Sequence, residues 1–115
     1  MVRDRKAVSC PVETTIRVVG GRWKVLVIHY LLGEDRRFNE LQRLLQGISP
    51  RTLTKQLREL EDDGIVSREA FPEIPPRVVY SLPALGRSLE SVLLAMARVT
   101  RRSRLQGGLS MSVDC

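Results

Sequence analysis

Apolar residues in the first third of the chain recur at helical spacing. Val12, Ile16 and Val19 are four and three positions apart, which predicts an amphipathic helix that begins at Pro11 and ends at the following pair of glycines. Residues 23–32 are apolar on nearly every side, which is typical of a helix buried at the centre of a core. The pattern therefore predicts an amphipathic helix followed by a central, buried one.

Polar residues divide the middle of the chain into two short helices. Residues 37–38 predict a very short strand, after which Asn39 is expected to be the N-cap of a third helix. The pair at residues 46–47 ends that helix after barely two turns. Ser49 followed by a proline is a typical helix start and predicts a fourth helix over residues 50–63.

The last third of the chain predicts a hairpin and a long helix. Two runs with β-branched residues, 65–70 and 77–82, are expected to pair as strands, and the three prolines between them give the hairpin a stiff tip. Residues 84–104 predict the last helix. Its apolar positions are spaced four, three, four and three residues apart, as in a coiled-coil seam: Leu85, Leu89, Val92, Met96 and Val99.

The order of these elements predicts a winged helix-turn-helix fold, mainly α with a small β-hairpin wing. A length of 115 residues fits a single domain. We expect that domain to occupy residues 10–106, with a flexible arm at residues 1–9 and a disordered tail at residues 107–115.

The net charge indicates an anionic partner. The chain has 19 Lys and Arg against 13 Asp and Glu, a formal charge of +6, which favours nucleic acid or an acidic membrane surface. All but three of the basic residues are arginine, which suits DNA, although codon usage in a GC-rich genome produces the same bias. No apolar stretch approaches the roughly 20 residues that span a bilayer, and the first residues lack a signal-peptide pattern, so we expect a cytoplasmic protein without a membrane partner.

The sequence indicates no metal, cofactor or catalytic site. Cys10, Cys115 and His29 are too few to hold zinc, and no pair of cysteines has metal-ligand spacing. There is no glycine-rich phosphate loop and no nucleophile with a neighbouring base. We therefore expect a protein that is not an enzyme.

The fourth helix is the predicted DNA-binding element. At about 100° per residue, Arg51, Lys55 and Arg58 share the face opposite its leucines. An α-helix fits the major groove, where arginine can donate two bonds to guanine, and the acidic residues near position 60 favour entry of the N-terminal half. The alternative is an ordinary solvated face. The expected contacts are Ser49, Arg51, Thr52, Thr54, Lys55 and Arg58, with Arg77 from the wing.

Several motifs resemble the HxlR-type bacterial transcription regulators. They are CPVE at residues 10–13, GGRWK at 20–24, RFNEL at 37–41, LTKQLREL at 53–60 and PPRVVYSL at 75–82. The resemblance implies a homodimeric winged-helix repressor or activator that reads an inverted repeat in double-stranded DNA. It places the dimer interface on the first and last helices, with Val12 and Ile16 beside the seam described above. One departure is Pro83, which stands where the family usually has a threonine N-cap.

Cys10 has two interpretations. A cysteine at a helix N-terminus near Arg5 and Lys6 can be reactive as thiolate. Some members of the resembling family sense oxidants or electrophiles through the matching cysteine, which implies a small oxidant or electrophile as effector. Apart from the resemblance, Cys115 is a candidate disulfide partner of Cys10. The alternative is a small residue that caps and packs the first helix.

The leading hypothesis is a dimeric, sequence-specific DNA-binding regulator, with repression as the predicted mode. One alternative is a winged helix that binds RNA or DNA without sequence preference. Another is a winged helix whose basic face binds an acidic protein. A thiol enzyme built on Cys10 is a further alternative for which the sequence offers no base.

Overall fold

The computed structural model describes residues 10–105, of which residues 103–105 are described by their backbone only. The predicted arm at residues 1–9 and the predicted tail at residues 107–115 lie outside this range. The elements in chain order are α1 (Pro11–Val19), α2 (Arg22–Gly33), β1 (Arg36–Arg37), α3 (Phe38–Leu44), α4 (Pro50–Asp62), β2 (Ser67–Phe71), β3 (Arg77–Ser81), α5 (Ala84–Arg87) and α6 (Glu90–Leu105).

The core lies between α2, α3, α4 and the inner side of a small sheet. Val27, Ile28 and Leu31 of α2 are fully buried, which confirms the predicted central helix. Trp23 packs against this core at its edge, as expected of a core residue. His29 is half-buried, and its ring lies edge-on to that of Tyr30 with the ring centroids 5.0 Å apart.

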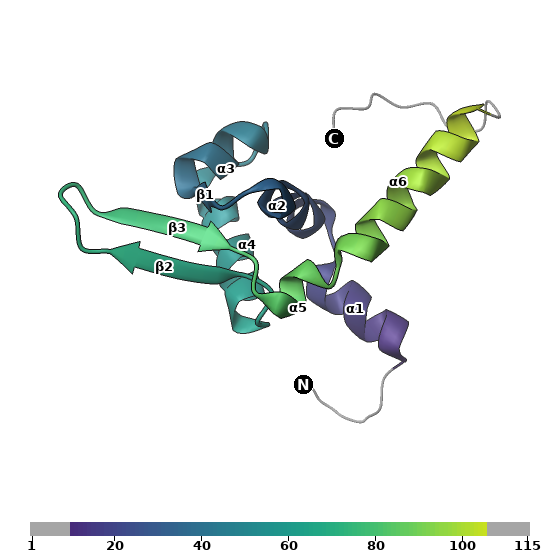
Figure 1. Ribbon diagram of the computed structural model, residues 1–115, viewed down its shortest axis with the longest axis horizontal. Coiled ribbons are helices and arrows are strands. Elements are labelled where there is room, and N and C mark those ends of the chain that lie inside the picture. The colour runs from purple at the N-terminus through teal and green to yellow at the C-terminus, as the bar shows by residue number, and fades with distance from the viewer. Residues whose placement is uncertain (1–9, 106–115) are drawn as a thin grey trace.

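The two predicted hairpin strands form an antiparallel pair and a third strand joins them. The sheet order is β1-β3-β2, and the hairpin of β2 and β3 forms the wing. The wing begins two residues later than predicted, at Ser67, because Ile65 and Val66 are buried and donate their backbone N–H groups to the carbonyl of Leu60. In Figure 1 the wing and α6 project from opposite ends of the helical core.

The connection between α3 and α4 is a tight turn. Gly47 has a φ of 92°, a left-handed conformation that glycine adopts without strain, and it reverses the chain after α3. Ser49 then caps α4 and Pro50 is its first residue, as predicted. The helix-turn-helix and the wing that follows it therefore have the predicted order.

The predicted N-cap of α3 is wrong. The helix begins at Phe38, and the cap is Arg37 rather than Asn39. Pairing of Arg37 with Val79 holds residue 37 in an extended conformation, and the Glu40 carboxylate accepts its backbone N–H at 2.7 Å. This bond from the cap residue to the Glu40 carboxylate closes the first turn earlier than the sequence pattern suggested.

The predicted last helix is interrupted. It starts at Ala84 as expected, but it divides into α5 and α6 at Ser88 and Leu89. The Ser88 hydroxyl donates to the carbonyl of Leu85, and the backbone N–H of Leu89 bonds to the carbonyl of Gly86 in a tighter turn. Leu85 therefore lies on α5 and Leu89 in the connecting turn, and only the last three residues of the predicted seam lie on α6.

Gly86 positions α5 against the connection after α4. A Cβ atom on Gly86 would overlap the backbone carbonyl of Ile65 and lie 2.9 Å from Leu82 Cδ2. Gly86→Ala is therefore expected to lower the free energy of unfolding by about 1–3 kcal/mol, measured by urea unfolding. Gly33→Ala is the matched control, because its nearest contact is the end of the Arg36 side chain at 3.4 Å. Equal stability of the two variants would contradict this packing.

Candidate DNA-binding surface

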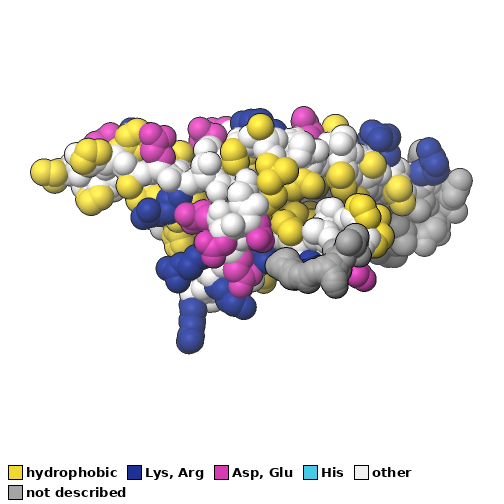
Figure 2. Space-filling model, turned by 90° about the horizontal axis from the view of Figure 1, so that it is seen from below, with side chains coloured by type: hydrophobic (Ala, Val, Ile, Leu, Met, Phe, Trp, Pro, Cys, Tyr) yellow, Lys and Arg dark blue, Asp and Glu magenta, His cyan; other side chains and the backbone are white. Residues whose placement is uncertain are grey.

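Burial of one face of α4 sets the direction of its basic residues. Leu53, Leu57 and Leu60 are 0%, 1% and 0% exposed, and they form the side of the helix that packs into the core. Arg51, Lys55 and Arg58 are exposed on the remaining side, as predicted. Figure 2 shows Lys and Arg side chains protruding from the half of the molecule that carries the wing, next to a group of Asp and Glu side chains.

The first turn of α4 is ordered by its own hydroxyl groups. The Ser49 Oγ accepts the backbone N–H of Thr52 at 3.1 Å and donates to the Thr52 Oγ1 at 2.9 Å. The Thr54 hydroxyl donates to the carbonyl of Pro50 at 2.8 Å. Three of the predicted DNA contacts, Ser49, Thr52 and Thr54, therefore stabilise the N-terminal end of α4 through these hydrogen bonds.

Acidic side chains share the exposed face of α4 with the basic ones. A shallow groove along the helix is lined by Arg51, Thr54, Lys55, Arg58, Glu59 and Asp62. Arg51 and Lys55 lie in the N-terminal half of the helix, whereas Arg58 lies in the C-terminal half together with Glu59 and Asp62. A polyanion therefore meets attraction at the first turns and repulsion at the last one.

Glu59 is held from below by a lysine of α2. Its Oε1 lies 2.7 Å from the Lys24 Nζ, and its Oε2 lies 3.6 Å from the Lys55 Nζ. The hydrogen bond from Lys24 is the main cause that lowers the pKa of Glu59 below its ordinary value, and partial desolvation opposes it. No role was assigned to Lys24 from the sequence. Its place in an otherwise apolar helix could have indicated an ion pair, because a buried ammonium group needs a partner of opposite charge.

Arg77 is fixed within the wing. Its guanidinium lies over the Phe71 ring at 4.0 Å, and its Nε and Nη2 donate to the Glu73 carboxylate, with a shortest distance of 2.9 Å. Hydrogen bonding from Arg77 is the main cause that lowers the pKa of Glu73 below its ordinary value. The predicted DNA contact of Arg77 must therefore use the donors that Glu73 leaves available.

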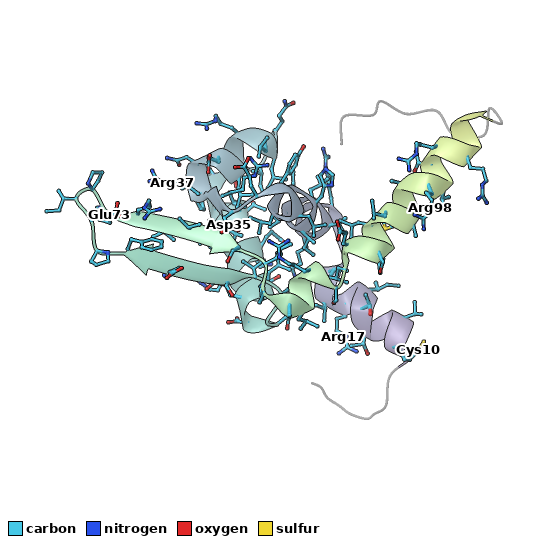
Figure 3. The ribbon with its side chains drawn as sticks, viewed as in Figure 1. Cys10, Arg17, Asp35, Arg37, Glu73 and Arg98 are labelled. Carbon is cyan, nitrogen blue, oxygen red and sulfur yellow. The ribbon has the colours of Figure 1, made fainter. Side chains whose placement is uncertain are left out.

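A second groove lies between β1, α3 and the wing. It is lined by Asp35, Arg36, Arg37, Glu40, Glu69, Phe71, Arg77 and Val79. Figure 3 shows Arg37 and Glu73 at the wing end of the molecule, opposite the end with Cys10 and Arg98. Arg36 is engaged within the fold, because its Nε donates to the carbonyl of Tyr30 at 3.2 Å. Arg37 is an exposed cation of this groove.

Most predicted interface residues are exposed apolar side chains at the other end of the molecule. Val12 and Ile16 of α1 are 66% and 61% exposed, and the members of the seam on α5 and α6 that are exposed are Leu85, Val92, Met96 and Val99. Leu89 differs, because it is half-buried and packs against the core of its own chain. Cys10 is an exposed free thiol at the N-cap of α1.

Within residues 10–105, the side chains that the structure describes contain no group of three or more His, Cys, Asp or Glu placed to bind a metal ion. No helix in this range is long and apolar enough to cross a membrane.

Comparison with known proteins identifies the class of the molecule. A model of the HxlR-like helix-turn-helix family matches residues 18–106. The chain belongs to the HxlR family. It is 49% identical over 88 residues to the uncharacterized HTH-type transcriptional regulator YdeP of Bacillus subtilis, covering 76% of this chain and 69% of YdeP. The matching family is one of helix-turn-helix proteins, and the matching relative is named a transcriptional regulator. The predicted resemblance to the HxlR family and the predicted class of DNA-binding transcriptional regulators are therefore confirmed.

Solved structures confirm the winged helix-turn-helix fold. The redox regulator HypR in its reduced form is 45% identical with a TM-score of 0.79, covering 83% of this chain and 94% of HypR. The reduced form of the transcriptional regulator YodB from Bacillus subtilis is 36% identical with a TM-score of 0.71, covering 79% of this chain and 90% of YodB.

The ion pair between Lys24 and Glu59 predicts a pH-dependent contribution to stability. Glu59→Gln should lower the free energy of unfolding by about 0.5–1 kcal/mol at neutral pH. The folded pKa of Glu59 is lower than its ordinary value of 4.5, so this contribution is present above that value and is lost as the pH falls through the folded pKa. Urea unfolding at a series of pH values measures it.

Glu61→Gln is the matched control, since it removes the same charge from α4 outside the contact with Lys24. It should not reproduce the pH-dependent difference. An equal loss in both variants at every pH would show that the ion pair has no specific effect.

Proposed function

We propose that this protein is a homodimeric, sequence-specific repressor in which α4 of each subunit reads one half-site of an inverted repeat. The observation that carries this proposal is the exposed basic face of α4, with Arg51, Lys55 and Arg58 directed away from three buried leucines. This face belongs to the second helix of a helix-turn-helix, and Arg51 and Lys55 lie in its N-terminal half, the part that enters the major groove in such folds.

The side chains of α4 offer different contacts to DNA. Arg51 supplies the paired donors that recognise guanine, and Lys55 and Arg58 supply charge for phosphates. The Thr52 hydroxyl accepts from Ser49, so its own hydrogen is left for a phosphate oxygen. The Thr54 hydroxyl donates to Pro50, which leaves its methyl group for the methyl group of thymine.

The wing contributes a phosphate contact through Arg77. The ion pair with Glu73 uses Nε and Nη2, which leaves the donors on Nη1 for DNA. Stacking on Phe71 holds the guanidinium in place, so little side-chain entropy is lost when it binds.

Direct binding measurements test the proposal. The reduced protein should prefer a duplex from the region upstream of its own gene over a scrambled duplex by about a hundredfold in fluorescence anisotropy, or roughly 3 kcal/mol. A reporter behind that region should be more active when the gene is deleted. Equal binding to both duplexes would favour the nonspecific DNA or RNA alternative, and no binding at low salt would favour an acidic protein partner.

Arg51→Ala should relax the preference for one base position in each half-site. The expected loss on the preferred duplex is about 1–3 kcal/mol, because a bidentate contact to guanine is removed. Anisotropy titration against duplexes with single substitutions measures it. Arg98→Ala removes the same charge from α6, at the opposite end of the molecule in Figure 3, and should leave the base preference unchanged. Identical base preferences for Arg51→Ala and the wild type would contradict the assignment.

A second copy of the chain is the proposed partner of the apolar end. The proposed interface consists of Val12 and Ile16 of α1 and the exposed seam residues Val92, Met96 and Val99 of α6, and both helices lie on the half of the molecule opposite the wing (Figure 1). Paired burial of these side chains removes apolar surface from water and sets two copies of α4 at a fixed separation.

Val92→Glu should convert dimers to monomers, because it places a charge within the seam where Val92 is 45% exposed. Light scattering measures the change. Leu94→Glu is the matched control: Leu94 is 50% exposed but lies about 160° around α6 from Val92. A charge at Leu89 is unsuitable as a test of the interface, because Leu89 packs on the core of its own chain and its substitution would also destabilise the fold. A dimeric Val92→Glu protein, or monomers from Leu94→Glu, would refute the seam.

Cys10 is proposed as the site through which an electrophile or oxidant weakens DNA binding. It begins α1, the helix whose apolar face is assigned to the dimer, so a group attached there displaces a helix between the two subunits. This chain resembles HypR, which is named a redox regulator, and YodB, whose structure is known in a diamide-treated form.

Alkylation with a maleimide, in which the Cys10 thiolate adds across the double bond, should lower affinity for the preferred duplex by about tenfold or more. The Cys10→Ser protein should be insensitive to the reagent, and the Cys115→Ser protein should respond as the wild type does. Loss of the maleimide response in the Cys115→Ser protein but not in the Cys10→Ser protein would exclude Cys10 as the sensor. A maleimide response that persists in the Cys10→Ser protein would exclude it as well.

A further inference from the structure

One carboxylate connects a lysine beneath α4 with a lysine on its DNA-facing side. Lys24 of α2 is only 11% exposed, and its Nζ lies 2.7 Å from Glu59 Oε1. The other oxygen of Glu59 lies 3.6 Å from the Nζ of Lys55, whose side chain is 69% exposed. Lys55 and Glu59 both line the groove along α4, so the carboxylate stands within the proposed DNA-binding surface.

Glu59 is shared unequally between the two lysines. A separation of 2.7 Å is that of a charge-assisted hydrogen bond, whereas 3.6 Å is an ion pair without a full hydrogen bond. Lys55 also precedes Glu59 by four residues, which is the less favourable order for such a pair on a helix. Lys24 is therefore the main partner of Glu59, and the donors of Lys55 remain largely available.

We propose that Lys24 is a positioning residue for DNA binding that acts through Glu59 to keep Lys55 available for a phosphate. The proposal rests on the DNA-binding function argued above. Lys24 itself stays beneath α4, and its contribution is to hold and neutralise the carboxylate. Without Lys24, the Glu59 carboxylate turns to Lys55 and takes the place of a phosphate there, and the surface that faces DNA loses one positive charge.

The lowered pKa of Glu59 is consistent with this arrangement, because the hydrogen bond from Lys24 is its largest cause and stabilises the charged carboxylate. A purely structural role is the competing explanation. In that case the pair would only fasten α2 to α4, and its loss would change the stability of the protein but not the number of phosphates that the folded protein neutralises.

The dependence of DNA affinity on salt separates these explanations. The slope of log Kobs against log salt changes by about 0.9 for each phosphate contact. Anisotropy titrations over a range of salt concentrations would compare the wild type, Lys24→Met, Glu59→Gln and the double variant on the upstream and scrambled duplexes. Arg22→Met is the matched control, since Arg22 is a neighbouring cation of α2 that lies over Trp23 instead of Glu59.

We expect Lys24→Met to weaken binding about five- to tenfold at moderate salt and to reduce the slope by about one contact. In the Glu59→Gln background the same substitution should change affinity by less than about twofold, because the carboxylate that captures Lys55 is absent. Lys24→Arg should restore both affinity and slope, and it keeps the proposal testable if Lys24→Met fails to fold. Arg22→Met should leave the slope unchanged.

An equal effect of Lys24→Met with and without Glu59, or an unchanged slope in folded Lys24→Met protein, would overturn the proposal. The wild type, Lys24→Met, Glu59→Gln and the double variant form a double-mutant cycle. Because phosphate contacts do not depend on base sequence, this cycle can be measured on the scrambled duplex as well. If the wild type binds both duplexes equally but the cycle shows the expected coupling, the sequence-specific function fails while the role of Lys24 stands. If the wild type prefers the upstream duplex but the cycle is additive, only the role of Lys24 fails.

Discussion

The burial of three leucines on α4 controls where the basic side chains of this helix point. Leu53, Leu57 and Leu60 are wholly enclosed against α2 and the segment before the wing, so α4 cannot rotate about its axis without exposing them to water. Exposing even one such side chain costs about 1.5–3 kcal/mol. The outward direction of Arg51, Lys55 and Arg58 is therefore a consequence of core packing, and a rigid helix loses little entropy when it binds DNA.

The same core separates two surfaces of opposite character. The wing projects at one end, and α1 and α6, which carry the exposed apolar residues, lie at the other (Figure 1), while the basic residues of α4 are exposed on the side away from its buried leucines. Because α5 is fixed against the connection after α4 through Gly86, in the proposed dimer a shift of α6 would reach that connection through α5. In the same proposal, Cys10 affects DNA affinity through the dimer interface, because it begins α1.

Local signals in the sequence predicted much of the fold. The Ser49-Pro50 start of α4, the leucine spacing and the proline-rich wing tip depend on neighbouring residues, and each was found where expected. The cap of α3 depends instead on the pairing of Arg37 with the distant Val79, and the burial of Leu89 depends on packing against the core. The interruption at Ser88 is a local turn, held by the bond from the Ser88 hydroxyl to the carbonyl of Leu85, which the regular apolar spacing did not reveal. Likewise, the bond from Lys24 to Glu59 joins residues 35 positions apart, so no spacing rule could reveal it.

The central claim is that two copies of α4 read DNA at a fixed separation. A binding selection from a pool of random duplexes tests it most directly, because the selection recovers the preferred sequence even when the operator is not known. We expect an enriched inverted repeat whose half-sites lie about one helical turn, or 10–10.5 base pairs, apart or a multiple of that distance. Recovery of no motif, or of a single unrepeated half-site, would contradict the claim.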